Sequence, residues 1–311
     1  MTLCAVSFMS CSKNEDAAPA PVRYDTLTAG WTKVAAQQAN DVFFVNNTGY
    51  LVSGRKISRS TNGGATWDSV SRVDDAINIF MTPDGKLFLN TVTGTTTYYK
   101  SLNNGANFSI VTGVGPVTDT YFTDNNFGIT VGPNAIFRTT DGGASWSQLT
   151  MGAYSTLNPL YATVALANNT TGWIANMDRI YKSNGALNDW VPSTINGAAT
   201  GANYSALSVI SSSVVYAAAY GGKLFKSTDG GTTFNLLKTL GTETGFTDIH
   251  FLTEQVGYLS CGHYIYKTTD AGVNWTKVAS TARLLISEIH FTDASHGWAS
   301  GEGEDVILKF N

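Results

Sequence analysis

The 311-residue sequence has little charge, few cysteines and no long apolar run. Charged residues make up 14% of the chain and the formal net charge is −4, which argues against a nucleic-acid partner because such a partner favours a concentrated basic face. Of the three cysteines, Cys4 and Cys11 lie at the N-terminus, so Cys261 alone remains in the body and cannot form an internal disulfide. No apolar stretch approaches the roughly 18 residues of a membrane-spanning helix.

What the chain does have is a repeat, marked by aromatic residues at intervals of 36 to 44 residues. Most of them close a motif of the form Ser/Thr-x-Asp/Asn-x-Gly-x-x-aromatic. The series is Trp31, Trp67, Phe108, Trp146, Trp190, Phe234 and Trp275. A period of about 40 residues is typical of a four-stranded unit repeated around a ring. We therefore predict an all-β fold over residues 23–311, a seven-bladed β-propeller of four-stranded antiparallel blades.

The two ends of this repeat array complement one another. The chain stops after the third strand of its last repeat, without the motif or its aromatic residue. Residues 30–34, Gly-Trp-Thr-Lys-Val, nearly repeat the fourth-strand string at 274–278, Asn-Trp-Thr-Lys-Val. We therefore expect the N-terminal strand, with Trp31, to close the last blade, which would leave no long unpaired strand edge.

The repeated motif has a structural explanation. An Asp or Asn side chain in a tight turn accepts hydrogen bonds from backbone N–H groups two residues on, and glycine supplies the positive φ of the turn. The predicted turn acceptors are Asn62, Asn103, Asp141, Asp229 and Asp270. These copies resemble the Asp-box, or bacterial neuraminidase repeat, and that resemblance implies that the acidic residue is structural. We therefore do not assign these carboxylates to catalysis.

The first 22 residues differ from the rest of the chain. A short apolar run, Leu3 to Met9, ends at Ser10-Cys11 and is followed by Lys-Asn-Glu-Asp and an Ala/Pro stretch. This segment resembles a bacterial lipoprotein signal, and its charged continuation resembles the export signal of Bacteroidetes surface lipoproteins. The resemblance implies a signal peptide over residues 1–10, lipidation at Cys11, a tether over residues 11–22, and a lipid-anchored location at the outer membrane or cell surface, with the periplasmic face as an alternative. No basic residue precedes the apolar run, so an ordinary cleaved signal, an unusual cytosolic start and a start upstream of Met1 also remain open.

Two histidines raise the question of a metal site in the predicted central channel. His250 and His290 share one first-strand position, and the other repeats hold Val42, Phe80, Tyr121, Ala165 and Ser208 there. The first strand of each blade lines the channel of a propeller, so both imidazoles are expected in the channel. A metal would need further ligands, for which only Asp248 or Glu288 is near in sequence. We predict polar channel-lining residues, and neither a metal site nor a cofactor.

The complete repeat, such as the stretch from Ile289 to Gly301 or from Phe122 to Trp146, resembles the photosystem II assembly factor propellers. This resemblance spans residues 31–311 and implies a seven-bladed, non-enzymatic, membrane-associated scaffold. Sialidases share the motif, but the Phe-Arg-Ile-Pro string that they carry is absent here. Xyloglucan-cleaving propellers pair two such domains around a cleft, whereas this chain has residues for one.

The functional expectation is a non-catalytic cell-envelope lipoprotein that acts as a binding or assembly scaffold through the loop face of the propeller. The alternative is a glycan-active hydrolase, sialidase-like or xyloglucanase-like. Aromatic residues in the longer loops suit contact with a protein or glycan ligand. With the two histidines, the candidate contact residues are Tyr154, Trp190, Tyr204, His250 and His290; coverage of the core is the alternative role of the aromatic ones.

Overall fold

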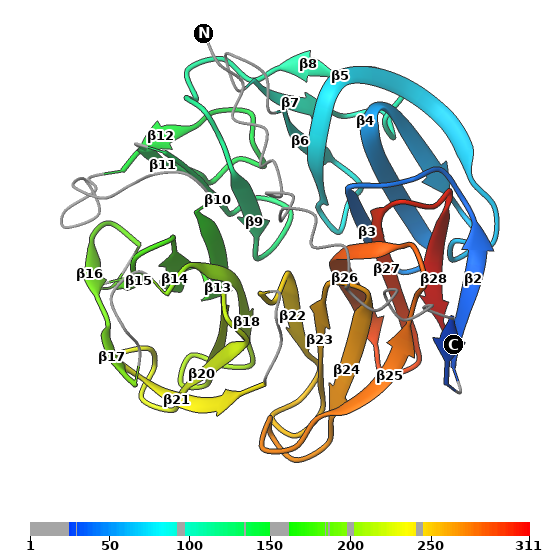
Figure 1. The fold of residues 1–311 in the computed structure, drawn as a ribbon. Helices are drawn as coiled ribbons and strands as arrows, with labels where there is room; N and C mark the ends of the chain where they lie inside the picture. Colours follow the sequence, from blue (N-terminus) through cyan, green and yellow to red (C-terminus); the bar gives the residue numbers. More distant parts are fainter. Residues whose placement is uncertain are drawn as a thin grey trace, which may run out of the picture.

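The computed structural model describes residues 25–311 except 29, 92–96, 134, 150–161, 184, 186, 198–201 and 241–244. The regular structure in this part of the chain consists of β-strands, grouped into sheets around a central axis (Figure 1). The predicted all-β propeller with four-stranded antiparallel blades is confirmed at this level. Cys11, the signal peptide and the tether lie outside the described residues.

Two sheets contain four antiparallel strands each, with the first strand nearest the axis in Figure 1. One comprises β9 (Asp119–Phe122), β10 (Gly128–Gly132), β11 (Ala135–Thr139) and β12 (Ser147–Gln148). The next comprises β13 (Thr163–Asn168), β14 (Thr171–Ala175), β15 (Ile180–Ser183) and β16 (Trp190–Pro192).

Two further sheets carry a fifth strand on their outer edge. One consists of β18 (Tyr204–Val209), β19 (Val215–Ala219), β20 (Lys223–Ser227) and β21 (Thr233–Thr239), to which β17 (Thr194–Asn196) adds in parallel. The other consists of β22 (Asp248–Phe251), β23 (Gly257–Cys261), β24 (Tyr264–Thr268) and β25 (Thr276–Ser280), to which β1 (Thr26–Leu27) adds antiparallel. Both additions cover an outer strand that would otherwise expose unpaired backbone groups.

The expected count of seven separate blades is wrong, because the hydrogen-bonded sheets number six in the described part of the chain. Strands β4 and β5 are 13 and 14 residues long, and Ala76 of β5 pairs with both Gly54 and Thr91. Backbone pairing therefore continues without a break through the first two sequence repeats, which share one six-stranded sheet. Its strands are β3 (Asp41–Val45), β4 (Thr48–Ser60), β5 (Asp68–Met81), β6 (Leu87–Thr91), β7 (Tyr98–Ser101) and β8 (Ser109–Ile110).

The last sheet joins the two ends of the chain, as the sequence predicted. It contains β26 (Leu285–Asp293), β27 (His296–Glu302), β28 (Val306–Phe310) and β2 (Trp31–Ala35). Strand β2 pairs antiparallel with β28 from Trp31↔Phe310 to Ala35↔Val306. Figure 1 shows the blue N-terminal strand beside the red C-terminal one.

Side chains reinforce this closure. Trp31 is 3% exposed and packs edge-to-face against Tyr258 and Phe291, with ring centroids 6.4 and 6.0 Å away. Two residues further along β2, Lys33 Nζ lies 2.7 Å from an Asp25 oxygen and 2.5 Å from a Glu304 oxygen. The N-terminal segment thus contacts two sheets at once.

The five turn motifs have one hydrogen-bond pattern. In the copy at Thr268, the Asp270 carboxylate accepts the Thr268 hydroxyl and the Asn274 backbone N–H, both at 2.8 Å, while Gly272 N–H donates to Thr268 Oγ1 at 3.0 Å. The accepted amide is therefore four residues on, where the sequence predicted two. The same bonds occur at Asn62, Asn103, Asp141 and Asp229.

Each motif also meets the preceding repeat. A Cβ on Gly231, whose φ is +81°, would lie 1.9 Å from Trp173 Nε1, and that indole N–H donates to the Gly230 carbonyl at 3.2 Å. Deeper in the interface, first-strand and second-strand aromatics of neighbouring repeats stack, as in Phe44 on Trp298 with centroids 3.7 Å apart. The core is thus a series of similar contacts between adjacent repeats.

We expect Trp31→Ala to lower the free energy of unfolding by about 3 to 5 kcal/mol, because it removes a buried indole from the sheet that closes the ring. Urea denaturation followed by far-ultraviolet circular dichroism would measure this. Leu102→Ala is the control, since Leu102 is 68% exposed. Equal stability of the two variants would contradict the closing role of Trp31.

A pair of glycine variants separates backbone strain from the packing of the motif. Gly221 has a φ of +72° and open space where a Cβ would stand, whereas Gly231 has both a positive φ and the Trp173 contact. We expect Gly221→Ala to cost about 1 to 2 kcal/mol from strain. Gly231→Ala should cost about 1 to 3 kcal/mol more from overpacking. Thermal unfolding of both proteins tests this, and similar losses would argue against the inter-repeat contact.

Candidate functional site

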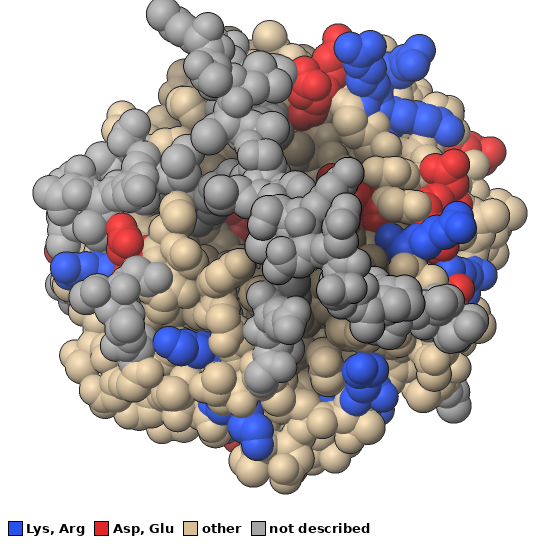
Figure 2. All heavy atoms as spheres, viewed as in Figure 1, with Lys and Arg blue, Asp and Glu red and all other residues tan. Residues whose placement is uncertain are grey.

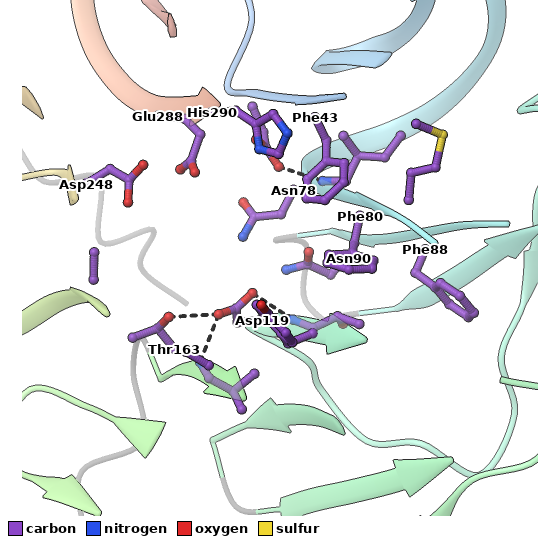
Figure 3. Close-up of a pocket in the computed structure, with 18 of the residues that line it drawn as sticks. Phe43, Asn78, Phe80, Phe88, Asn90, Asp119, Thr163, Asp248, Glu288 and His290 are labelled. Carbon is purple, nitrogen blue, oxygen red and sulfur yellow. Dashed lines mark hydrogen bonds between the residues drawn. The ribbon is translucent and has the colours of Figure 1, made fainter. Parts of the chain in front are cut away.

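A cavity of about 950 Å³ lies where the first strands of the sheets meet (Figure 3). Its walls come from β3, β5, β9, β13, β18, β22 and β26, together with neighbouring segments. The first strand of each repeat is the inner edge of its sheet. It forms hydrogen bonds with the second strand on one side, and its other side borders the central cavity. Alternate first-strand residues therefore form two levels, one mainly acidic or polar and one mainly aromatic.

The aromatic level contains the two predicted histidines. His250 and His290 both line the cavity, on β22 and β26, with ring centroids 6.2 Å apart. In β3 the equivalent residue is Phe43, not Val42 as the spacing of the repeat predicted. The hairpin that follows β3 is one residue shorter, since Phe43 pairs with Tyr50, seven residues on, whereas His290 pairs with Trp298, eight residues on. Val42 is buried in the neighbouring core.

The acidic level lies two residues earlier and was not predicted as a set from the sequence. Asp41, Asp119 and Asp248 begin β3, β9 and β22. Each carboxylate accepts a backbone N–H from the first strand of the following repeat: Ile79 at 2.7 Å, Val164 at 2.9 Å and Ile289 at 3.0 Å, respectively. We refer to these three contacts as the aspartate clamps. The sequence feature that could have predicted the clamps is an Asp two positions before the residue that faces the channel.

Glu288 occupies the equivalent position in β26 but forms no clamp with another described residue. A β-bulge between Ile286 and Glu288 places Ser287 out of the regular pairing, and Ser287 donates its hydroxyl to the Asn40 carbonyl at 2.9 Å. Among the described residues, the Glu288 carboxyl interacts electrostatically with the side chain of Asp248. Figure 3 shows both carboxyl groups directed toward the open centre.

No Lys or Arg is found among the described residues that line the cavity. Burial without a positive partner raises the pKa of Asp41 to about 7 and that of Asp119 to about 6. Burial also raises the pKa of Glu288 well above its ordinary value, with the charge of Asp248 as the next cause, and raises the pKa of Asp248. These carboxyl groups therefore ionise at higher pH than exposed ones, and a cation that enters the cavity would favour their charged form.

Both histidines are neutral at physiological pH. Burial lowers the pKa of His250 to about 3 and that of His290 to about 4. His290 donates from Nε2 to the Phe44 carbonyl at 2.8 Å, whereas His250 makes no hydrogen bond with another described residue. No group of three His, Cys, Asp or Glu side chains in the described part of the chain is arranged to hold a metal ion.

The other predicted contact residues have different outcomes. Trp190 is fully buried and Tyr204 is 3% exposed, so neither can touch a ligand from the surface. The loop lengths suggested exposure, but Trp190 stands in the aromatic position of its repeat and packs in the core with Leu187, while Tyr204 begins β18 and packs on Phe225. Tyr154 lies outside the described residues.

Comparison with known proteins supports the fold. Neither a protein-family profile nor the sequence of a curated protein matches this chain. Among solved structures, YCF48 from Cyanidioschyzon merolae has a TM-score of 0.72 and 19% identity, covering 91% of this chain and 99% of that one. YCF48 bound to D1 peptide has a TM-score of 0.67 and 16% identity, with coverages of 92% and 99%.

An enzyme of the same architecture is also similar. The GH74 xyloglucanase from Xanthomonas campestris has a TM-score of 0.67 and 15% identity, covering 90% of this chain and 53% of that one. The chain thus spans about half the length of that enzyme. At these identities the likenesses establish a β-propeller fold, which assembly factors and hydrolases share.

The raised pKa of Asp41 predicts a pH effect on stability. Because its pKa is about 7 in the folded protein and near 3.8 when unfolded, its stabilising contribution is complete below pH 4 and is lost as pH rises through 7. The two histidines act in the opposite direction, below pH 6.5. We therefore expect the melting temperature of Asp41→Asn, relative to the wild type, to increase between pH 6.5 and 8. Asp74→Asn, at an exposed acid, is the control; a pH-independent difference for Asp41→Asn would refute the assignment.

Proposed function

We propose that this chain is a non-catalytic cell-envelope lipoprotein whose propeller binds a protein partner at one end of the ring. The observation that carries the proposal is that most of the acidic residues of the motifs and the cavity form structural hydrogen bonds. The motif carboxylates hold turns, and three of the four cavity carboxyls form the aspartate clamps. Groups that support the framework through fixed hydrogen bonds are poorly suited to exchange protons with a substrate.

The peptide-bound YCF48 structure supports the choice of partner. That propeller binds D1 peptide, and its match with this protein covers nearly the whole length of both chains. A rigid ring with an open centre presents loops from every repeat at each end, which suits recognition of an extended segment. We infer that this chain also binds polypeptide, without carrying over the identity of the peptide.

Attachment to the envelope rests on Cys11 and the preceding apolar run. In the described residues, no helical segment has the length and hydropathy required to cross a membrane. Lipidation of Cys11 would anchor the propeller through a tether, with the outer membrane or cell surface as the proposed location. One acyl modification combined with protein contacts would hold the domain near its partner.

A glycan hydrolase remains the second candidate because Asp248 and Glu288 form a carboxyl pair inside a cavity. Their geometry favours binding instead. Glycosidases need both carboxyl groups free to act on the glycosidic bond. Asp248 accepts the backbone N–H groups of Ile249 and Ile289, so one member of the pair already holds the framework.

The test is crosslinking in intact cells that produce the full chain with Cys11 retained. We expect a discrete protein adduct in the membrane fraction, because the lipid anchor places the ring near its partner. Cys11→Ala should release the protein from that fraction and remove the adduct. Cys4→Ala is the matched control and should leave both unchanged.

Two results would contradict the proposal. One is retention of Cys11→Ala in the membrane fraction together with the absence of a protein adduct for the wild type. The other is turnover of xyloglucan, another β-glucan or a sialoside by the purified chain, abolished by Glu288→Gln. The second result would establish the hydrolase instead.

A further inference from the structure

The cavity combines acidic groups, an unpartnered imidazole and aromatic surface. We propose that this cavity receives a basic side chain, Lys or Arg, from the partner polypeptide; this inference rests on the proposed function. Glu288 and Asp248 would contact the cation, and the aromatic level would cover its alkyl stem.

Charge imbalance is the first argument. Asp41, Asp119, Asp248 and Glu288 all line the cavity, and no Lys or Arg does so among the described residues. The Lys and Arg side chains visible in Figure 2 belong to residues outside this lining. A guanidinium or ammonium entering the cavity would supply the missing opposite charge in surroundings that screen charge less than water does.

Unused hydrogen-bond capacity is the second argument, and it is independent of charge. A carboxyl group has about four acceptor sites. In the described structure Glu288 uses its carboxyl only with Asp248, whereas Asp119 and Asp248 each accept two backbone amides. His250 is partly exposed, lines the cavity and makes no hydrogen bond with another described residue. These polar atoms therefore remain available to a hydrogen-bonding group that enters the cavity.

The aromatic level provides the third argument. Phe43 and Phe80 lie with ring centroids 4.7 Å apart, Tyr121 is 6.1 Å from Phe80, and His290 is 4.4 Å from Phe43. These rings form a continuous surface beside the acidic level (Figure 3). Such a surface packs well on an alkyl stem and stacks with a guanidinium.

The size of the cavity favours a polypeptide over a free amine. About 950 Å³ is near the upper end of the range for pockets that enclose drug-sized ligands. This space exceeds what one cation needs and admits the residues flanking it in a chain. The three arguments together specify a cation with an apolar stem, carried on a larger molecule.

Titration calorimetry on the full chain tests this with three probes. The first is the capped tripeptide Gly-Arg-Gly, the second is its citrulline counterpart, which is nearly isosteric but uncharged, and the third is butylguanidinium, a free alkylguanidinium with a single charge. We expect the arginine peptide to bind at least about tenfold more tightly than either of the others. Glu288→Gln should weaken arginine-peptide binding at least about tenfold, while Asp74→Asn, which changes an exposed acid outside the cavity, should not.

The outcomes are distinct from those of the crosslinking experiment. Absence of arginine-peptide binding, equal binding of the citrulline peptide, or wild-type affinity in Glu288→Gln would overturn the proposal even if a protein adduct forms in cells. Butylguanidinium binding as tightly as the peptide would assign the cavity to a small cation instead. The citrulline comparison uses the wild-type chain and remains decisive if Glu288→Gln does not fold.

Discussion

Antiparallel pairing of β2 with β28 is the interaction on which the rest of the propeller depends. It joins segments more than 270 residues apart in the sequence, so its formation must offset the entropy of closing nearly the whole chain into a loop. Burial of Trp31 and the two ion pairs of Lys33 supply local stabilisation. The circumference of the ring is set only when this pairing forms, and the width of the central cavity follows from it.

Within the closed ring, neighbouring repeats are joined at two distances from the axis. Close to the axis, the aspartate clamps link first strand to first strand. A different bond joins β18 and β22, where Ser208, at the level of the histidines, accepts the Phe251 N–H at 2.8 Å. Farther out, stacked aromatics and the motif glycines fill the interface. Because these contacts tolerate different side chains, the repeats can diverge while the ring is retained.

The fold was largely predictable because its signals are local and periodic. The strand–turn–strand unit, the turn acceptors and the pairing of residues 30–34 with the last repeat each follow from short strings. The blade count was not predictable in the same way. Only Val73, Asp74 and Asp75 lie between the paired residues Arg72 and Ala76 of β5, and whether such a short connection interrupts hydrogen bonding depends on three-dimensional pairing. Loop length was also a poor guide to Trp190, which packs fully buried in the core despite the long loop predicted around it.

The acidic level shows why the candidate site was harder to find than the fold. Glu288 occupies the same position in its repeat as Asp41, Asp119 and Asp248 do in theirs. The three aspartates hold the next repeat through the aspartate clamps, whereas Glu288 forms no such clamp with a described residue. The Glu288 side chain is one methylene longer, and a β-bulge directly precedes it in β26. Enclosing an acidic group that gives no structural contact costs stability, and such costs are typical of positions where a protein meets a ligand. The same register position therefore serves the framework in three repeats and is available for recognition in the repeat that closes the ring.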